Sequence, residues 1–249
     1  MTNLWFEDEE FWRELFPYMF PPERLASGDD EVAQVLALTR LSRGAVLDLC
    51  CGPGRHSVAF ALRGCAVTAV DRSPFLLVKA RQLAIENNAA IDWVQEDMRR
   101  FVRSAAFDLA CSLFTSFGYF ETEEDDLAVL RNIHESLKPG GIFVMEMLGK
   151  ERLARVWQSP RSTVHANGAR VIELAEVRND WTRIHCEWIV IREGRARSFR
   201  FEHTAYSGRE LKDRLRLCGF ADVRLFGDLQ GAPYGLDAPR LVAVARKGE

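Results

Sequence analysis

The sequence lacks several features that would place it in other classes of protein. Its 249 residues carry a formal net charge of −3, so no overall basic field favours nucleic acid as a partner. No apolar segment approaches the length of a membrane span. We also find no basic stretch followed by a hydrophobic run, which disfavours a secretory signal. These features predict a cytoplasmic protein without membrane contact.

The chain also lacks the usual patterns of disulfide-linked and metal-binding proteins. None of its six cysteines forms a C-x-x-C pair, which favours reduced, buried thiols over a disulfide framework. His165, His185 and His203 have a spacing that fits no metal signature, so no metal site is predicted. We expect these three histidines to face solvent from strands.

Hydrophobic periodicity divides the chain into three parts. Residues 1–42 are typical of aromatic-rich helices. Residues 43–149 and 207–249 alternate short apolar runs with amphipathic helices, which indicates a doubly wound α/β domain with a mostly parallel sheet. Residues 150–206 instead predict consecutive antiparallel strands, with Asn167-Gly168 as a hairpin turn. We therefore expect a small antiparallel β lobe inserted late in the α/β domain.

Local signals mark the ends of individual elements. Helix starts are predicted at Ser73, Thr122 and Ser207 from their capping patterns, and a turn is predicted over residues 138–141. The expected strands of the α/β domain cover residues 45–49, 66–70, 91–96, 108–113, 142–148, 221–226 and 241–245.

The central signal is the loop Asp48-Leu49-Cys50-Cys51-Gly52-Pro53-Gly54, which joins a buried strand to a helix. Its glycines permit close approach of a ligand, and the helix N-terminus offers free N–H groups. Neither G-x-G-x-x-G nor a Walker lysine is present, which disfavours dinucleotides and nucleoside triphosphates. Asp71 and Asp97 end the next two strands, where carboxylates can meet ribose hydroxyls and an adenine amine. The pattern predicts an adenosine ligand.

These segments resemble the class I S-adenosylmethionine-dependent methyltransferases. Residues 107–114 are similar to the fourth motif of that family, and residues 137–143 to the turn before its fifth strand. The resemblance implies a seven-stranded sheet and S-adenosyl-L-methionine as the cofactor. Cys50 stands where a glycine is usual, and we expect a backbone contact there, not a nucleophile. The implied cofactor contacts are Asp48, Cys50, Gly52, Gly54, Arg55, His56, Asp71, Arg72, Asp97, Met98 and Leu113.

The resemblance also places the methyl acceptor beyond the fourth strand, at residues 114–120. The Asn- or Asp-Pro-Pro-aromatic tetrapeptide of amino-purine and glutamine methylators is missing there. Ser116-Phe117-Gly118-Tyr119 is instead similar to small-molecule N-methyltransferases, which carry an aromatic N-terminal helix over the active site and an antiparallel lobe. The hypothesis is therefore in-line methyl transfer to a small molecule, with an amine nitrogen as one candidate acceptor.

Particular side chains are expected at this acceptor site. Tyr119 is the candidate catalytic residue, and the glycine-rich loop over residues 227–235 is expected to border the site. The predicted substrate contacts are Tyr18, Phe114, Phe117, Tyr119 and Tyr206.

Two alternative functions stay open at this point. A Rossmann-type NAD-dependent oxidoreductase is disfavoured by the missing G-x-G-x-x-G and by the Lys138-Pro139-Gly140-Gly141 turn. An S-adenosylmethionine-binding module without catalysis could act through partners that contact the N-terminal aromatics and the inserted sheet. A homodimer is also left open as the oligomeric state.

Overall fold

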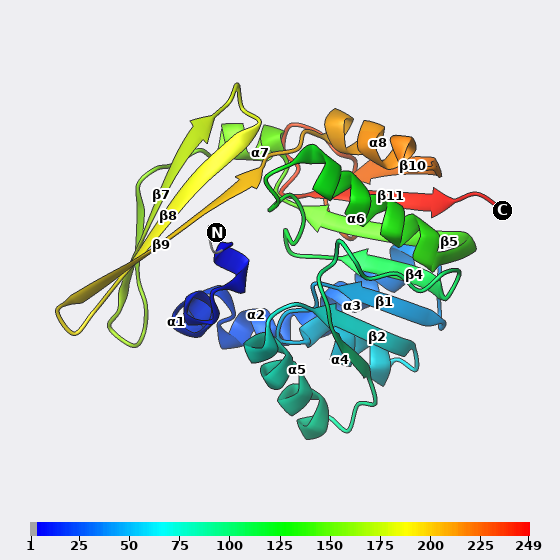
Figure 1. Ribbon diagram of the computed structural model, residues 1–249, viewed down its shortest axis with the longest axis horizontal. Helices are drawn as coiled ribbons and strands as arrows, with labels where there is room; N and C mark the ends of the chain where they lie inside the picture. The colour runs from blue at the N-terminus through cyan, green and yellow to red at the C-terminus, as the bar shows by residue number, and fades with distance from the viewer. Residues whose placement is uncertain (1–3) are drawn as a thin grey trace.

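The computed structural model describes residues 4–249, and its largest element is a seven-stranded sheet. β11 runs antiparallel to both of its neighbours, and all other neighbouring strands are parallel (Figure 1). The order β10-β11-β5-β4-β1-β2-β3 confirms the predicted doubly wound, mostly parallel sheet. Its strands are β1 (Ala45–Leu49), β2 (Ala66–Asp71), β3 (Asp92–Gln95), β4 (Phe107–Ser112), β5 (Leu137–Met147), β10 (Phe220–Phe226) and β11 (Leu241–Lys247).

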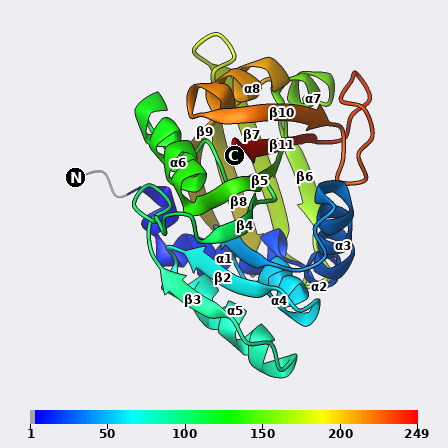
Figure 2. The ribbon, with the colours of Figure 1, turned by 90° about the vertical axis from the view of Figure 1, so that its right-hand side faces the viewer.

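Helices cover both faces of this sheet. Successive residues of β1 point to opposite faces, so Val46 joins an apolar cluster with Phe60 whereas Leu47 joins one with Leu130. α3, α4 and α5 cover the first face, and α6 and α8 cover the second (Figure 2). Burial on both faces explains why the strands are continuous apolar runs. The helices are α3 (Gly28–Thr39), α4 (Arg55–Leu62), α5 (Pro74–Glu86), α6 (Glu123–Ser136) and α8 (Gly208–Leu217).

The predicted helix starts are confirmed by the cap contacts. The side chains of Ser73, Thr122 and Ser207 each accept a hydrogen bond from a backbone N–H in the first turn of the following helix. Ser207 does so within a complete capping box, because the side chain of Glu210 accepts the N–H of Ser207 in return.

One boundary differs from the sequence prediction. β5 begins at Leu137, so residues 138–141, which were predicted as a turn, lie inside this strand. Gly140 there has a φ of 72°, and the pairing with β4 is interrupted between Phe107 and Leu109. The glycine turn therefore forms a bulge, and the strand pairs with β4 on both sides of it.

A second sheet of four antiparallel strands follows in the order β6-β7-β8-β9. The β6–β7 hairpin turns at Asn167-Gly168, as the sequence predicts, and the β8–β9 hairpin turns at Glu193-Gly194. The preceding segment contains α7 (Lys150–Arg155). The strands are β6 (Arg161–Val164), β7 (Arg170–Arg178), β8 (Arg183–Arg192) and β9 (Arg195–Thr204).

The N-terminal helices lie between the second sheet and the carboxyl edge of the main sheet (Figure 1). α1 (Glu9–Met19) buries Phe11 and Leu15 in an apolar cluster with Val171 and Phe199 of the second sheet. The short helices η1 (Trp5–Glu7) and α2 (Pro22–Ala26) flank α1. Within residues 4–249, no helix has the length and apolar character needed to cross a bilayer.

Candidate active site

A cavity of about 940 Å³ lies at the carboxyl edge of the main sheet. β1 pairs with β2 on one side and with β4 on the other, so the order in which successive strands are added to the sheet reverses at β1. Such a switch point is where doubly wound sheets bind ligands. Among the residues predicted to contact the cofactor, those that line the cavity are Cys50, Gly52, Arg55, His56, Asp71, Arg72, Asp97, Met98 and Leu113.

The loop after β1 owes its shape to three residues with positive φ, which are Cys50 (59°), Gly52 (55°) and Gly54 (82°). A Cβ on Gly52 would meet only the ring of Phe20, at 3.7 Å, so this backbone faces the cavity. A Cβ on Gly54 would come within 2.8 Å of the Cβ of Ala80. Gly54 is therefore a packing requirement between α4 and α5, and it does not line the cavity as predicted.

Cys50 adopts the backbone conformation that its neighbouring glycines adopt easily. A left-handed non-glycine residue stores about 1–3 kcal/mol of strain. Its Sγ lies 3.4 Å from the Sδ of Met98. Burial, reinforced by nearby carboxylates, raises the pKa of the Cys50 thiol well above its usual range. The thiol stays protonated at neutral pH, which supports a backbone role over a nucleophilic one.

Asp71 joins the end of β2 to the glycine loop. Its Oδ2 accepts the N–H of Gly52 at 2.8 Å, and its Oδ1 accepts the N–H of Ser73 at 2.9 Å. Burial raises the pKa of Asp71 to about 6. Each oxygen keeps a lone pair, so the carboxylate can still accept the two hydroxyls of a ribose. The buried acid beside an open glycine backbone thus fits an adenosine-containing cofactor.

Asp97 also lines the cavity, but its carboxylate is already heavily bonded. Oδ2 accepts Arg72 at 2.5 Å and Arg99 at 2.7 Å, and Oδ1 accepts both the backbone N–H and the Nε of Arg99. Burial acts to raise the pKa of Asp97, but these arginines hold it below its usual value. The Nε of Arg99 also lies 3.3 Å from Oδ2, so an adenine amine would have to replace one of these five bonds, which the sequence could not show.

Asp48 is not a direct cavity residue. It is buried below the glycine loop, and its Oδ2 accepts the hydroxyl of Ser57 at 2.5 Å. Burial raises the pKa of Asp48, against the opposing charges of His56 and Arg55. Asp48 therefore supports the start of α4 from below the glycine loop. The sequence predicted instead that Asp48 contacts the cofactor directly.

The aromatic run after β4 divides between cavity and core. Of the predicted acceptor contacts, Tyr18, Phe114 and Tyr119 line the cavity. Phe117 and Tyr206 do not, and they pack against each other in the main core with ring centroids 5.6 Å apart. The hydroxyl of Tyr206 donates to Asp126, on α6, at 2.6 Å. This corrects their assignment to the substrate site, because spacing alone cannot tell which aromatics of a loop point inward.

Two histidines that were expected to face solvent line the cavity instead. The ring of His165 packs against that of Tyr18 at an interplanar angle of 59°, with centroids 4.7 Å apart, and the ring of His203 lies 5.8 Å from that of Tyr119. His185 does not line it, and pairs with Glu202 at 3.1 Å. A sequence signal existed for His203, because it continues the alternating apolar face of Phe199-x-Phe201 on β9.

The cavity has further basic residues that the sequence analysis missed. Arg24 from α2 and Arg240 from the residue before β11 both line it. They are far apart in the chain, and no local pattern predicts that they meet. Within residues 4–249, no group of three or more histidine, cysteine or acidic side chains is placed to hold a metal ion.

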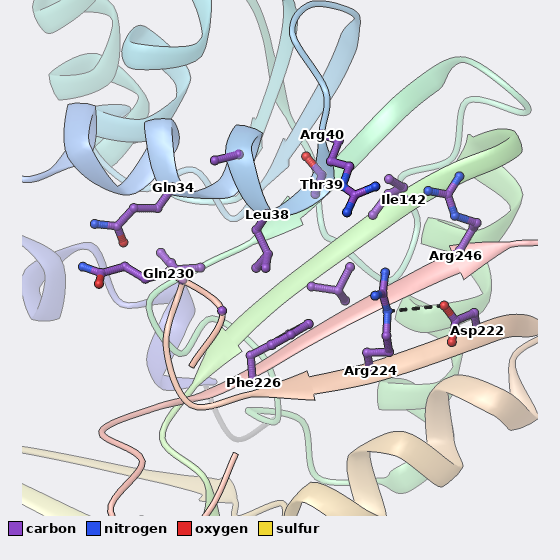
Figure 3. Close-up of a pocket in the computed structure, with 14 residues that line it drawn as sticks. Gln34, Leu38, Thr39, Arg40, Ile142, Asp222, Arg224, Phe226, Gln230 and Arg246 are labelled. Carbon is purple, nitrogen blue, oxygen red and sulfur yellow. Dashed lines mark ion pairs between the residues drawn. The ribbon is translucent and has the colours of Figure 1, made fainter. Parts of the chain in front are cut away.

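The late glycine-rich loop borders a different hollow, of about 670 Å³. Gln230 of this loop faces Gln34 and Leu38 of α3, with Arg224 on the neighbouring strand (Figure 3). Residues 227–235 do not line the main cavity, so the expectation that they border the active site was wrong. This second hollow lies on the flank of the sheet, away from the glycine loop.

Residues 46–141 match the family model for a methyltransferase domain. These residues, from β1 into β5, therefore form a methyltransferase domain, and the fold of the chain is that of class I S-adenosylmethionine-dependent methyltransferases. S-Adenosylmethionine is accordingly the cofactor of this methyltransferase. The similar proteins do not support either alternative function, the Rossmann-type oxidoreductase or the non-catalytic binding module.

Relatives of this methyltransferase cover most of its length. It is 25% identical over 225 residues to a cypemycin N-terminal methyltransferase from Streptomyces sp, covering 90% of this chain and 91% of that protein. It is 28% identical over 214 residues to a glycine/sarcosine N-methyltransferase from Aphanothece halophytica, covering 81% and 76%. An S-adenosylmethionine-dependent methyltransferase from Clostridium acetobutylicum has the same fold, with a TM-score of 0.78, 15% identity and coverage of 96% and 98%.

Proposed function

We propose that this methyltransferase acts on a small molecule and that the acceptor atom is an amine nitrogen. The observation that carries the proposal is the aromatic-walled cavity that joins the glycine loop to the second sheet. Its volume of about 940 Å³ lies within the range of small-molecule sites. Of the relatives described above, one is named as an N-methyltransferase and another as an N-terminal methyltransferase, which favours nitrogen as the acceptor.

The cofactor would supply a methyl group already activated by its sulfonium. The protein must then hold two reactants in line and exclude water, which can lower the barrier by about 7–11 kcal/mol. Asp71 and the backbone of Gly52 would hold the adenosine part, with Cys50, Met98 and Leu113 beside it. Asp48 and Gly54 would act indirectly, by shaping the loop.

Aromatic side chains would form the acceptor half of the cavity. The ring centroid of Trp5 lies 5.0 Å from that of Tyr119 and 5.2 Å from that of Phe201. Tyr18 adds a further ring from α1. Such faces exclude water and attract a cation, so they would favour both the sulfonium and a positively charged amine.

An amine must lose its proton before it can attack a methyl group. Burial raises the pKa of Tyr119 well above its usual range, so its hydroxyl keeps its proton and can only orient the acceptor. Burial lowers the pKa of His203, so its imidazole is neutral at pH 7 and can accept that proton. His203 Nδ1 lies 3.3 Å from the carbonyl oxygen of Thr204. A proton on Nδ1 would leave Nε2 as the acceptor.

The decisive experiment is identification of the product. The protein would be incubated with methyl-labelled S-adenosylmethionine and a small-molecule extract, followed by panels of amines, phenols and thiols. A labelled amine is the expected product. Label found only in a phenol, a thiol or a macromolecule would contradict the proposal.

The cytoplasmic location and the homodimer stay predictions.

A further inference from the structure

The second hollow exists because no helix covers the outer two strands on one face of the main sheet. β10 and β11 are antiparallel neighbours joined by the loop of residues 227–240, so the connection between them needs no crossover helix. α8 packs against both strands on the opposite face. The hollow of about 670 Å³ that remains has the size of a small-molecule site. Its apolar lining consists of Leu38, Ile142, Phe226, Leu229 and Val244.

Positive charge exceeds negative charge along the lining of this hollow. Arg40, Arg224 and Arg246 line it, and Asp222 is the one acidic residue of the lining within residues 4–249. The Oδ2 of Asp222 lies 3.4 Å from the Nε of Arg224. Arg246 donates to the carbonyl oxygen of Gly140 at 2.9 Å, and neither it nor Arg40 has a carboxylate oxygen within 4.0 Å in the described chain. Three guanidinium groups and one carboxylate leave two positive charges in excess.

The three arginines gather at one end of the hollow although they come from different elements (Figure 3). Arg40 directly follows the last turn of α3, in a left-handed conformation with a φ of 58°. Arg224 lies on β10 opposite Val244 of β11, and Arg246 follows two residues later on β11. Side chains two positions apart share a face of a strand, so Arg224 and Arg246 project from the same side of the sheet. Their planar guanidinium groups are suited to the oxygens of a phosphate.

The opposite end of the hollow carries two amides. Gln34 of α3 and Gln230 of the late loop lie together there, with Leu38 and Phe226 between them and the arginines (Figure 3). Gln230 donates its backbone N–H to Asp228 at 2.9 Å, and neither side-chain amide has a hydrogen-bond partner within residues 4–249. Each amide offers two donors and an acceptor, which can meet the polar edge of a base. The apolar side chains beside them can contact the flat face of the same base.

We propose that the second hollow binds a nucleoside monophosphate, with its phosphate at the arginines and its base beside Leu38 and Phe226. A phosphate monoester carries about −1.5 to −2 charges at pH 7, which matches the two positive charges in excess. Inorganic phosphate would leave the apolar lining and the amides unused, and an uncharged apolar molecule would leave the arginines unused. No residue that lines this hollow also lines the main cavity. The nucleotide site is therefore separate from the site of methyl transfer.

The test measures equilibrium binding by isothermal titration calorimetry with S-adenosylhomocysteine saturating, so that the cofactor part of the main cavity is filled. The probes are UMP and GMP, each compared with its own nucleoside and with inorganic phosphate. AMP is left out because its adenosine can enter the cofactor site. At least one of the two nucleotides should bind about tenfold or more tightly than either of its parts, because the phosphate and the base are held at once.

The double variant R40M/R224M should weaken the binding of that nucleotide about tenfold or more, because two charged forks are lost. It should keep the affinity of wild type for S-adenosylhomocysteine, which shows that it is folded. The matched control is R209M/R216M, which changes the net charge equally on α8, against the opposite face of the sheet. Arg209 pairs with a neighbouring aspartate as Arg224 does, and Arg216 is exposed like Arg40.

The proposal is overturned if neither nucleotide binds, or if inorganic phosphate binds as tightly as the nucleotide. It is also overturned if R40M/R224M binds the nucleotide as well as R209M/R216M does, because the nucleotide then occupies a different place, such as the acceptor half of the main cavity. None of these measurements requires methyl transfer, so their outcome is independent of the product search.

Discussion

The carboxylate of Asp71 and the backbone amide of Gly52 are joined by a hydrogen bond of 2.8 Å. This bond links the end of β2 to the glycine loop after β1, across 19 positions of sequence. One buried acid therefore fixes the backbone that would meet the cofactor and also offers its remaining lone pairs to a ribose. Loop geometry and ligand recognition depend on the same side chain.

Asp71→Asn should weaken S-adenosylhomocysteine binding about 10- to 100-fold. The reason is that hydrogen bonds to a charged group contribute about 1.5–3 kcal/mol, and an amide cannot accept at both of its ends. Isothermal titration calorimetry would measure the Kd. Asp92→Asn is a suitable control, because Asp92 pairs with Arg103 at the surface start of β3. If the two variants bind S-adenosylhomocysteine with equal affinity, Asp71 does not take part in binding the cofactor.

Binding should also depend on pH through Asp71. Burial raises its pKa in the folded protein to about 6 from an ordinary value of 3.8, so the folded state takes up a proton before the unfolded chain does. Between pH about 4 and 6, Asp71 therefore lowers the stability of the ligand-free protein as pH rises. Ribose hydroxyls donate best to the ionised form.

The Kd for S-adenosylhomocysteine should therefore rise as pH falls below about 6, by up to about tenfold per pH unit, and be flat above it. Titrations from pH 5 to 8 would measure this, and the dependence should be lost in Asp71→Asn. A wild-type Kd that stays constant down to pH 5 would show that the ionised carboxylate is not required.

Much of the scaffold could be predicted because its signals are local. The apolar runs of β1 and β2, the cap at Ser73 and the Asn167-Gly168 hairpin each occupy a few neighbouring residues. The acids at strand ends could be placed for a similar reason, since parallel strands bring their carboxyl ends to one edge.

The rest of the site depends on contacts between distant segments. Arg24 and Arg240 meet at Phe114 from opposite ends of the chain, and nothing near either residue indicates this. Phe117 and Tyr119 differ by two positions, yet one enters the core and the other lines the cavity. The turn at Gly118, with a φ of 95°, decides between them, and its direction is set by packing against Thr204 and Tyr206.

Tyr206→Phe should destabilise the protein without changing cofactor affinity. Its hydroxyl donates to buried Asp126 at 2.6 Å, and the other oxygen of that carboxyl group already has no partner in the described structure. Removing the donor should lower the free energy of unfolding by about 1–3 kcal/mol. Urea denaturation would measure the free energy of unfolding, and isothermal titration calorimetry would measure the affinity for the cofactor.

Tyr234→Phe provides the matched control, because Tyr234 donates to Glu151 at 2.6 Å in an exposed position. Its effect should stay below about 1 kcal/mol, since water can replace the lost partner. If Tyr206→Phe instead weakens ligand binding and leaves the free energy of unfolding unchanged, Tyr206 belongs to the substrate site and not to the core.

Glu9→Ala should loosen the N-terminal helices over the cavity. Glu9, at the start of α1, accepts the hydroxyl of Ser73 at 2.9 Å and the N–H of Phe75 at 3.0 Å, which ties α1 to the first turn of α5. Loss of two such bonds, each worth about 0.5–1.5 kcal/mol, should increase the dissociation rate of S-adenosylhomocysteine several-fold.

Stopped-flow tryptophan fluorescence would report this rate, because Trp5 of η1 and Trp12 of α1 both line the cavity. The control is Glu86→Ala at the far end of α5, where Glu86 accepts a hydrogen bond from Gln82 at the surface. If the two variants release the ligand at the same rate, α1 is not held closed through Glu9.

His203→Gln should change the pH dependence of turnover once the acceptor is known. Without a neutral imidazole to take the ammonium proton, kcat/KM at pH 7 should fall by about 100-fold or more, the usual contribution of a positioned base. The deficit should shrink as pH rises, because the free amine then becomes abundant in solution. Tyr119→Phe should lower kcat/KM about tenfold at every pH, since its protonated hydroxyl only orients the acceptor.

His185→Gln is the control for a general effect of altering the second sheet. His185 lies on β8, pairs with Glu202 and does not line the cavity, so its loss should leave the profile unchanged. A merely structural role of His203 would lower kcat/KM by a constant factor across the pH range. If His203 accepts the proton, kcat/KM should recover at high pH in His203→Gln but not in Tyr119→Phe. If the two variants show the same pH dependence, His203 is not the base.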